Sequence, residues 1–205
     1  MNYSAVSSMN VCGAILTLYP DPSDDEAAFA EGWVYSDPGL AANRAAECVV
    51  QGFTAVKFDP ARPCTVYSPR QPELVAMDRS ELFAKRIREA VGSKAYMLCG
   101  TYGQFSTSGA IQFAQRLEGD DPLWFEEPTS PDFTEEMAVM ARQTSIPIAT
   151  GKRLTTKHEF VRVPKVQAAS ILKRHPGSQE HRWHDRSALC PDRPPSLLQT
   201  GRQRH

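Results

Sequence analysis

The stretch Leu123-Trp124-Phe125-Glu126-Glu127-Pro128 decides how the rest of the chain is interpreted. Three large apolar residues in succession are typical of a parallel strand that is covered on both faces. Two carboxylates and a proline then end the run, and in α/β folds ligands bind beyond the carboxyl ends of the strands. Because adjacent strand residues point to opposite sides, only one of Glu126 and Glu127 can face a given centre. The stretch predicts a buried strand that opens onto a site; a solvated Glu-Glu-Pro turn is the alternative.

Strands with polar endings recur at regular intervals around this one. A later apolar strand ends at Lys152, 26 residues after Glu126, and an earlier one ends at Gly100, 26 residues before it. A still earlier strand ends with Lys57 and Asp59. Each strand is followed by a helix-like segment, and the interval suits one strand, one crossover helix and two short loops. The series predicts an α/β fold with a parallel sheet, either open or closed into a barrel.

Local signals mark the intervening elements. The apolar run 11–19 predicts a first strand, and Asp37 followed by Pro38 predicts a helix that Gly52 ends. A further helix is expected over 106–117. Three pairs have the spacing of a capping box at a helix start: Asp78 with Glu81, Asp132 with Glu135, and Thr156 with Glu159.

A long insertion follows the strand that carries Lys57, over residues 61–77. Loops at this end of a barrel shape the substrate pocket. Arg62, Tyr67 and Arg70 would then contact an acidic ligand, or they are ordinary residues of an exposed loop.

Taken together, three motifs resemble the enolase superfamily, in particular its mandelate racemase and muconate lactonizing branch with its sugar-acid dehydratases and cycloisomerases. The motifs are Ala55-Val56-Lys57-Phe58-Asp59-Pro60, Trp124-Phe125-Glu126-Glu127-Pro128, and the segment Ile146 to Thr156. The resemblance covers about residues 19–170. It implies a partial (β/α) TIM-type barrel with parallel strands, lacking the family's N-terminal capping domain and its last strands.

The resemblance also implies a chemistry. In that family three acids at successive strand ends hold a magnesium ion, and a lysine or a His-Asp pair removes the proton next to a carboxylate. Glu126 matches the second metal ligand, and Lys57 matches a lysine of the family's catalytic Lys-x-Lys motif. Asp59, a second catalytic candidate, occupies the position of the other lysine in that motif. The other two ligand positions are Gly100 and Lys152, which have no carboxylate. An ammonium group beside Glu126 would neutralise the site, so the sequence predicts no magnesium binding.

Four further polar groups are candidate substrate-binding residues, and the implied substrate is a small sugar acid. They are Tyr102, Gln104, Glu127 and Lys152. For Tyr102, packing in the core is an equal alternative.

Composition limits the other classes of function. The chain has 205 residues, a formal net charge of −1 and five cysteines. A charge this small gives no bulk attraction to nucleic acid or an anionic membrane. The run 11–19 is too short to span a bilayer. The odd cysteine count without a Cys-x-x-Cys pair predicts a reducing, cytoplasmic setting. A homo-oligomer remains open.

The sequence predicts two parts, a partial barrel over 1–171 and a basic, disordered tail over 172–205. Residues 173–205 hold seven Lys and Arg against three acids and keep no helical or strand period. A zinc site at His181, His184 and Cys190 and a nucleic-acid-binding arm are the alternatives to disorder.

Two classes of function follow. One is the family's enzyme, a lyase or cycloisomerase with Lys57 as the base and Glu126 on the metal. The other is a non-catalytic remnant, or a truncated product of such a gene, that keeps the strand pattern. A third reading makes Lys152 a Schiff-base nucleophile.

Overall fold

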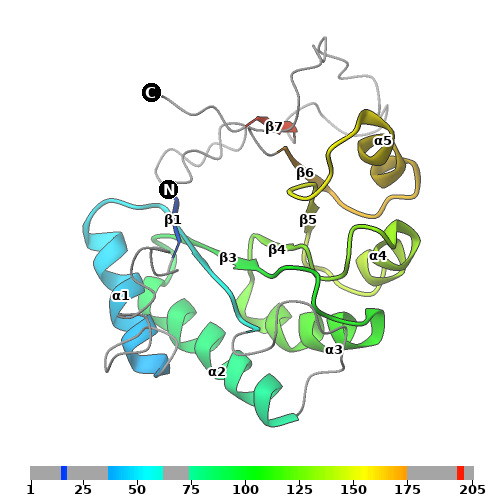
Figure 1. Ribbon diagram of the computed structural model, residues 1–205. Coiled ribbons are helices and arrows are strands. Elements are labelled where there is room, and N and C mark those ends of the chain that lie inside the picture. Colours follow the sequence, from blue (N-terminus) through cyan, green and yellow to red (C-terminus); the bar gives the residue numbers. More distant parts are fainter. Residues whose placement is uncertain (1–14, 18–36, 62–73, 175–197, 201–205) are drawn as a thin grey trace, which may run out of the picture.

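A computed structural model describes residues 15–17, 37–61, 74–174 and 198–200 of the chain. The described strands form one parallel sheet in the order of the sequence. In Figure 1 they curve around a centre with the helices on the outside, so the α/β partial barrel predicted above is confirmed. The strands are β1 (Ile15–Thr17), β2 (Ala55–Phe58), β3 (Tyr96–Gly100), β4 (Trp124–Glu126), β5 (Ile148–Thr150), β6 (Ile171–Arg174) and β7 (Leu198–Thr200).

Helices connect the successive strands from β1 to β6. They are α1 (Pro38–Val50), α2 (Leu74–Val91), α3 (Thr107–Leu117) with the 3-10 turn η3 (Glu118–Asp120), α4 (Thr134–Ala141) and α5 (Lys157–Lys165). The predicted start of α1 is confirmed: the Asp37 carboxylate accepts hydrogen bonds from the N–H groups of Gly39 and Leu40. Gly52 follows the helix with a φ of 91°, a conformation that glycine adopts without strain.

Of the three predicted capping boxes, only Thr156 with Glu159 is present. The prediction at Asp78 is wrong because α2 already begins at Leu74, which places Asp78 inside the helix. The prediction at Asp132 is wrong because α4 begins at Thr134 after an N-cap without a side-chain hydrogen bond.

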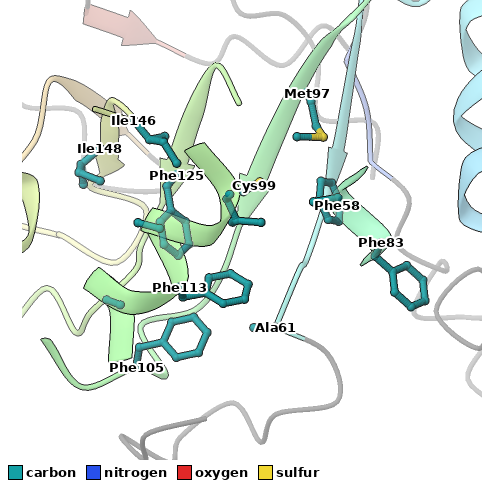
Figure 2. Packing of buried hydrophobic residues seen from close by; sticks show 14 of the residues in the cluster. Phe58, Ala61, Phe83, Met97, Cys99, Phe105, Phe113, Phe125, Ile146 and Ile148 are labelled. Carbon is teal, nitrogen blue, oxygen red and sulfur yellow. The ribbon is translucent and has the colours of Figure 1, made fainter. Parts of the chain in front are cut away.

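The sheet has an apolar cluster on each of its faces. The larger cluster joins the strands to the helices and contains the rings of Phe105, Phe113 and Phe125 (Figure 2). Cys48 and Cys99 are fully buried within it. Among the described side chains, the smaller cluster takes one buried residue from each of five neighbouring strands and none from a helix: Ala55, Leu98, Trp124, Ala149 and Ile171. It therefore lies on the inner face of the curved sheet.

The inner cluster determines which polar residues line the inside of the carboxyl edge. Side chains of a strand alternate between its two faces, so the residue two positions further on shares the face. Two positions after Ala55, Leu98, Trp124 and Ile171 come Lys57, Gly100, Glu126 and Lys173. These four positions form the next inner layer, at the end where the strands finish.

The strand pattern extends beyond the predicted boundary between residues 171 and 172. Strand β6 covers Ile171–Arg174, and it pairs in parallel with β5 and with β7. Ile171 packs in the inner cluster, and Lys173 forms an ion pair with Glu126 of β4. The rest of the predicted tail, 175–197 and 201–205, lies outside the described residues, together with His181, His184 and Cys190.

The first strand and the insertion are described only in part. Strand β1 falls within the predicted run 11–19. The last four residues of the expected insertion, 74–77, belong to α2. Arg62, Tyr67 and Arg70 lie outside the described residues.

At the amino end of the strands, Arg88 of α2 connects two loops. Its guanidinium donates to the carbonyl groups of Gly92 and Ala95 in the loop before β3, at 3.1 and 3.2 Å. It also donates to the carbonyls of Asp120 and Asp121 in the loop before β4, at 2.7 and 2.9 Å. One side chain thus satisfies four carbonyl groups at the end of the sheet opposite the polar layer.

None of the helices in the described ranges is both long and apolar enough to cross a membrane.

The capping box gives a first test of the fold. Replacing the cap, Thr156→Ala, should lower the free energy of unfolding by about 1 kcal/mol, because the N–H of Glu159 loses its acceptor. Asp132→Ala is the matched control, since the one donor to its carboxylate among the described residues is the Ser130 hydroxyl in an exposed turn. Urea denaturation followed by circular dichroism measures both. An equal loss in the two variants would contradict the assignment of the cap.

Candidate functional site

The predicted cluster of strand-end residues is present at the carboxyl edge. Lys57, Gly100 and Glu126 come from the adjacent strands β2, β3 and β4, and Lys152 follows the next strand, β5. Gly100 pairs directly with Glu126 in the register of the sheet. The recurring strand ends of the sequence therefore meet at one edge, as predicted.

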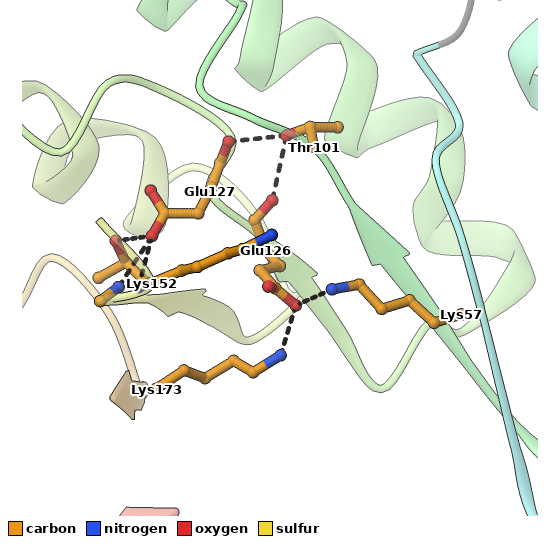
Figure 3. Close-up of polar contacts among 8 residues, drawn as sticks. Lys57, Thr101, Glu126, Glu127, Lys152 and Lys173 are labelled. Atoms are coloured by element: carbon orange, nitrogen blue, oxygen red, sulfur yellow. Dashed lines mark hydrogen bonds and ion pairs between the residues drawn. The ribbon is translucent and has the colours of Figure 1, made fainter. Parts of the chain in front are cut away.

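The centre of this edge is the carboxylate of Glu126, which is only 3% exposed. Its Oε2 atom accepts a hydrogen bond from the Lys57 ammonium at 2.6 Å and another from the Lys173 ammonium at 2.7 Å. Figure 3 shows the two lysines reaching this oxygen from different sides. One carboxylate on β4 is thus bound by cations from β2 and β6.

The charges of these groups control one another. Burial would raise the pKa of Glu126, but the charges and hydrogen bonds of Lys57 and Lys173 outweigh it and hold the pKa at about 2. Burial lowers the pKa of Lys173; Glu126 opposes this shift, while the charges of Lys57 and Lys152 add to it. Because the one carboxylate of Glu126 pairs with both Lys57 and Lys173, a single negative charge faces two positive charges.

Gly100 gives Lys57 its path to Glu126. A Cβ atom at position 100 would overlap Cε of Lys57 and lie 3.1 Å from its Nζ atom. The lysine side chain therefore occupies the volume that a longer residue on β3 would need. Lys57 can therefore take its observed position because residue 100 has no side chain.

Glu127 has a different environment, although it is also buried at 1% exposure. Its Oε1 atom accepts from the Thr150 hydroxyl and from the N–H groups of Gly151 and Lys152, at 2.9 to 3.1 Å. Burial raises its pKa, and these hydrogen bonds, together with the charge of Arg153, oppose the rise. Its φ of 49° is left-handed. These contacts favour a role in fixing the turn after β5, and substrate binding by Glu127 stays a prediction.

The remaining candidate residues lie around the same edge. The Lys152 ammonium is 4.6 Å from the centre of the Tyr102 ring, a cation–π contact. Gln104 is buried and accepts from the Tyr102 N–H at 2.8 Å. Asp59 is also buried and accepts from the Ala61 N–H at 2.9 Å. Their catalytic or substrate-binding roles stay predictions.

The residue that the sequence interpretation missed is Lys173. We expected the Lys152 ammonium to neutralise Glu126, whereas Lys57 and Lys173 both donate to it. The signal was present: Lys173 lies two residues after the apolar Ile171, on the same face of a strand.

The residues of this edge do not fit a magnesium ion. Magnesium requires several oxygen ligands in near-octahedral geometry. Among residues 37–61 and 74–173, no group of three or more His, Cys, Asp or Glu side chains is arranged to hold a metal ion. The ligand position on β3 is filled by Lys57, and Oε2 of Glu126 already has two ammonium partners.

The link between Gly100 and Lys57 can be tested. Gly100→Ala should displace the end of Lys57 and raise the pKa of Glu126 above about 2, because one of its two cations moves away. A carboxyl-detected NMR titration measures this pKa. Gly119→Ala is the control, because a Cβ there would meet no atom within 4 Å. An unchanged pKa of Glu126 in Gly100→Ala would contradict the proposed displacement.

Comparison with known proteins supports the resemblance seen in the sequence. Residues 40–177 match the family model of the enolase C-terminal domain-like proteins. A D-gluconate/D-galactonate dehydratase of Picrophilus torridus is 34% identical over 138 residues. This match covers 66% of the chain and 34% of the relative, so the chain spans about a third of the length of that protein.

Solved structures show the same relationship. A protein of Labrenzia alexandrii described as a mandelate racemase/muconate lactonizing enzyme is 54% identical, with a TM-score of 0.68 over 78% of this chain and 40% of its own. A mandelate racemase/muconate lactonizing enzyme-like protein of Roseovarius sp. TM1035 is 45% identical, with a TM-score of 0.71 over 82% of this chain and 41% of its own. The family match over more than half of the chain, together with the parallel sheet and its strand-end residues, shows that the chain belongs to the enolase C-terminal domain-like family.

Proposed function

We propose that the chain binds a small sugar acid at the carboxyl edge of its sheet and does not perform the magnesium-dependent proton abstraction of its family. The observation that carries the proposal is the contact of both Lys57 and Lys173 with Glu126 Oε2. Positive groups stand where the family pattern has a metal ion, and the carboxylate of a sugar acid is a suitable partner for them.

The same contact argues against Lys57 as a base in this arrangement. A lysine takes up a proton only as the neutral amine, whereas a lysine in an ion pair with a carboxylate is an ammonium. In the described geometry Lys57 is therefore suited to hold an anion.

The family's lyase or cycloisomerase reaction is the second candidate. It is favoured by one specific observation: Lys57 and Glu126 occupy the inner layer at the strand ends, where the family pattern has its base and its second metal ligand. The named relative is a dehydratase of D-gluconate and D-galactonate, which makes these two acids the first substrates to test.

Calorimetry can separate the two candidates. We expect no heat of binding when magnesium is added to millimolar concentration, because the edge lacks the oxygen ligands that the ion requires. The Glu126→Gln variant serves as the baseline. Saturable magnesium binding that is present in the parent chain and absent in this variant would refute the proposal.

The substrate class is tested in the same way. D-gluconate and D-galactonate should bind without magnesium, and added magnesium should produce no dehydration, followed as formation of a 2-oxo acid. If neither sugar acid binds, the proposed ligand class is refuted. Turnover that depends on magnesium would establish the second candidate instead.

A further inference from the structure

The carboxyl edge carries more positive than negative charge. Three ammonium groups, those of Lys57, Lys152 and Lys173, lie near the single carboxylate of Glu126. The other buried acids nearby have separate partners. Glu127 accepts from backbone N–H groups and lies 3.8 Å from Arg153, and Asp59 accepts from a backbone N–H.

Exposure increases from the carboxylate towards the lysines. The Glu126 side chain is 3% exposed, that of Lys57 15% and that of Lys173 27%. The Glu126 carboxylate is thus more deeply buried than the two lysine side chains, which are more accessible to a ligand. Each ammonium has three N–H donors, and within the described ranges Glu126 Oε2 takes one from each. The Nζ atom of Lys173 also lies 5.2 Å from the centre of the Trp124 ring. Among the residues that the structure describes, no other hydrogen-bond acceptor takes the remaining N–H donors, so an incoming anion can accept them.

We propose that Lys57 and Lys173 form a clamp for an oxyanion and that Glu126 is its resident counter-ion. Glu126 matches a metal ligand in the family pattern, but here its carboxylate accepts hydrogen bonds from both lysines. It therefore competes with an incoming carboxylate or phosphate instead of helping to bind the ligand. The inference rests on the proposed function only for the choice of a sugar acid as the natural oxyanion.

The clamp predicts an effect opposite in sign to that of a metal site. In a metal site, loss of a ligand carboxylate weakens binding. In the clamp, Glu126→Gln keeps the shape of the side chain and an acceptor oxygen but removes the negative charge next to the incoming anion. A unit charge at such short range has a large effect at the intermediate dielectric of a protein edge, so the affinity for anions should rise by about tenfold or more.

The experiment is calorimetric titration of the full chain with inorganic phosphate and with D-gluconate, at low salt and without divalent cations, and acetate serves as the reference carboxylate. Glu126→Gln should bind both anions about tenfold more tightly than the parent chain. Lys173→Met should bind them about tenfold more weakly, because one ammonium of the clamp is lost. Lys94→Met removes an exposed lysine just before β3, at the opposite end of the sheet, and should leave both affinities unchanged.

The outcomes are decisive even if one variant does not fold. Unchanged or weaker anion binding by folded Glu126→Gln would overturn the inference, and so would unchanged binding by Lys173→Met. If Glu126→Gln does not fold, the comparison of Lys173→Met with Lys94→Met decides. Tighter phosphate binding without a preference for D-gluconate over acetate would support the clamp and refute the sugar acid. Binding of D-gluconate that Glu126→Gln leaves unchanged would refute the clamp alone.

Discussion

The carboxyl edge depends on one buried ionic contact, in which the Glu126 carboxylate is neutralised by Lys57 and Lys173. A charge removed from water carries a desolvation cost of several kcal/mol unless a partner of opposite sign is held close. The two partners come from strands on either side of β4, which requires β2 and β6 to end at matching heights. The contact thereby specifies how the curved strands are arranged, and it need not add net stability to do so.

Gly100 leaves the space through which Lys57 reaches the buried Glu126 carboxylate. With Lys57 in its observed position, the adjacent strand β3 has no room for a side chain in front of Glu126, because a Cβ atom at Gly100 would overlap the end of Lys57. An acid at position 100 of β3 and the Lys57 ammonium would therefore use the same space next to Glu126. Lys152 at the third position is compatible with the lysine arrangement, because its ammonium lies over the Tyr102 ring.

Sequence reasoning recovered the parallel strands, their order and the shared edge, because alternating burial and regular spacing are local properties that the chain shows directly. It was wrong at residues whose contacts are with side chains far away in the sequence. Lys173 appeared to end the strand pattern, since its partner Glu126 is 47 residues away in the chain. The start of α2 was misplaced because Asp78 has the spacing of a cap, whereas its carboxylate instead pairs with Arg116 of α3 at 2.5 Å. Helix caps can be recognised locally, but a competing ion pair between two helices cannot.

The four carbonyl contacts of Arg88 have a consequence for the tolerance of this chain to mutation. They fasten the loops before β3 and β4 at the end of the strands remote from Glu126. Substitutions at the carboxyl edge, for example at Gly100 or Lys152, would leave these four hydrogen bonds intact. A barrel built in this way can accept changes at its carboxyl edge while its architecture persists.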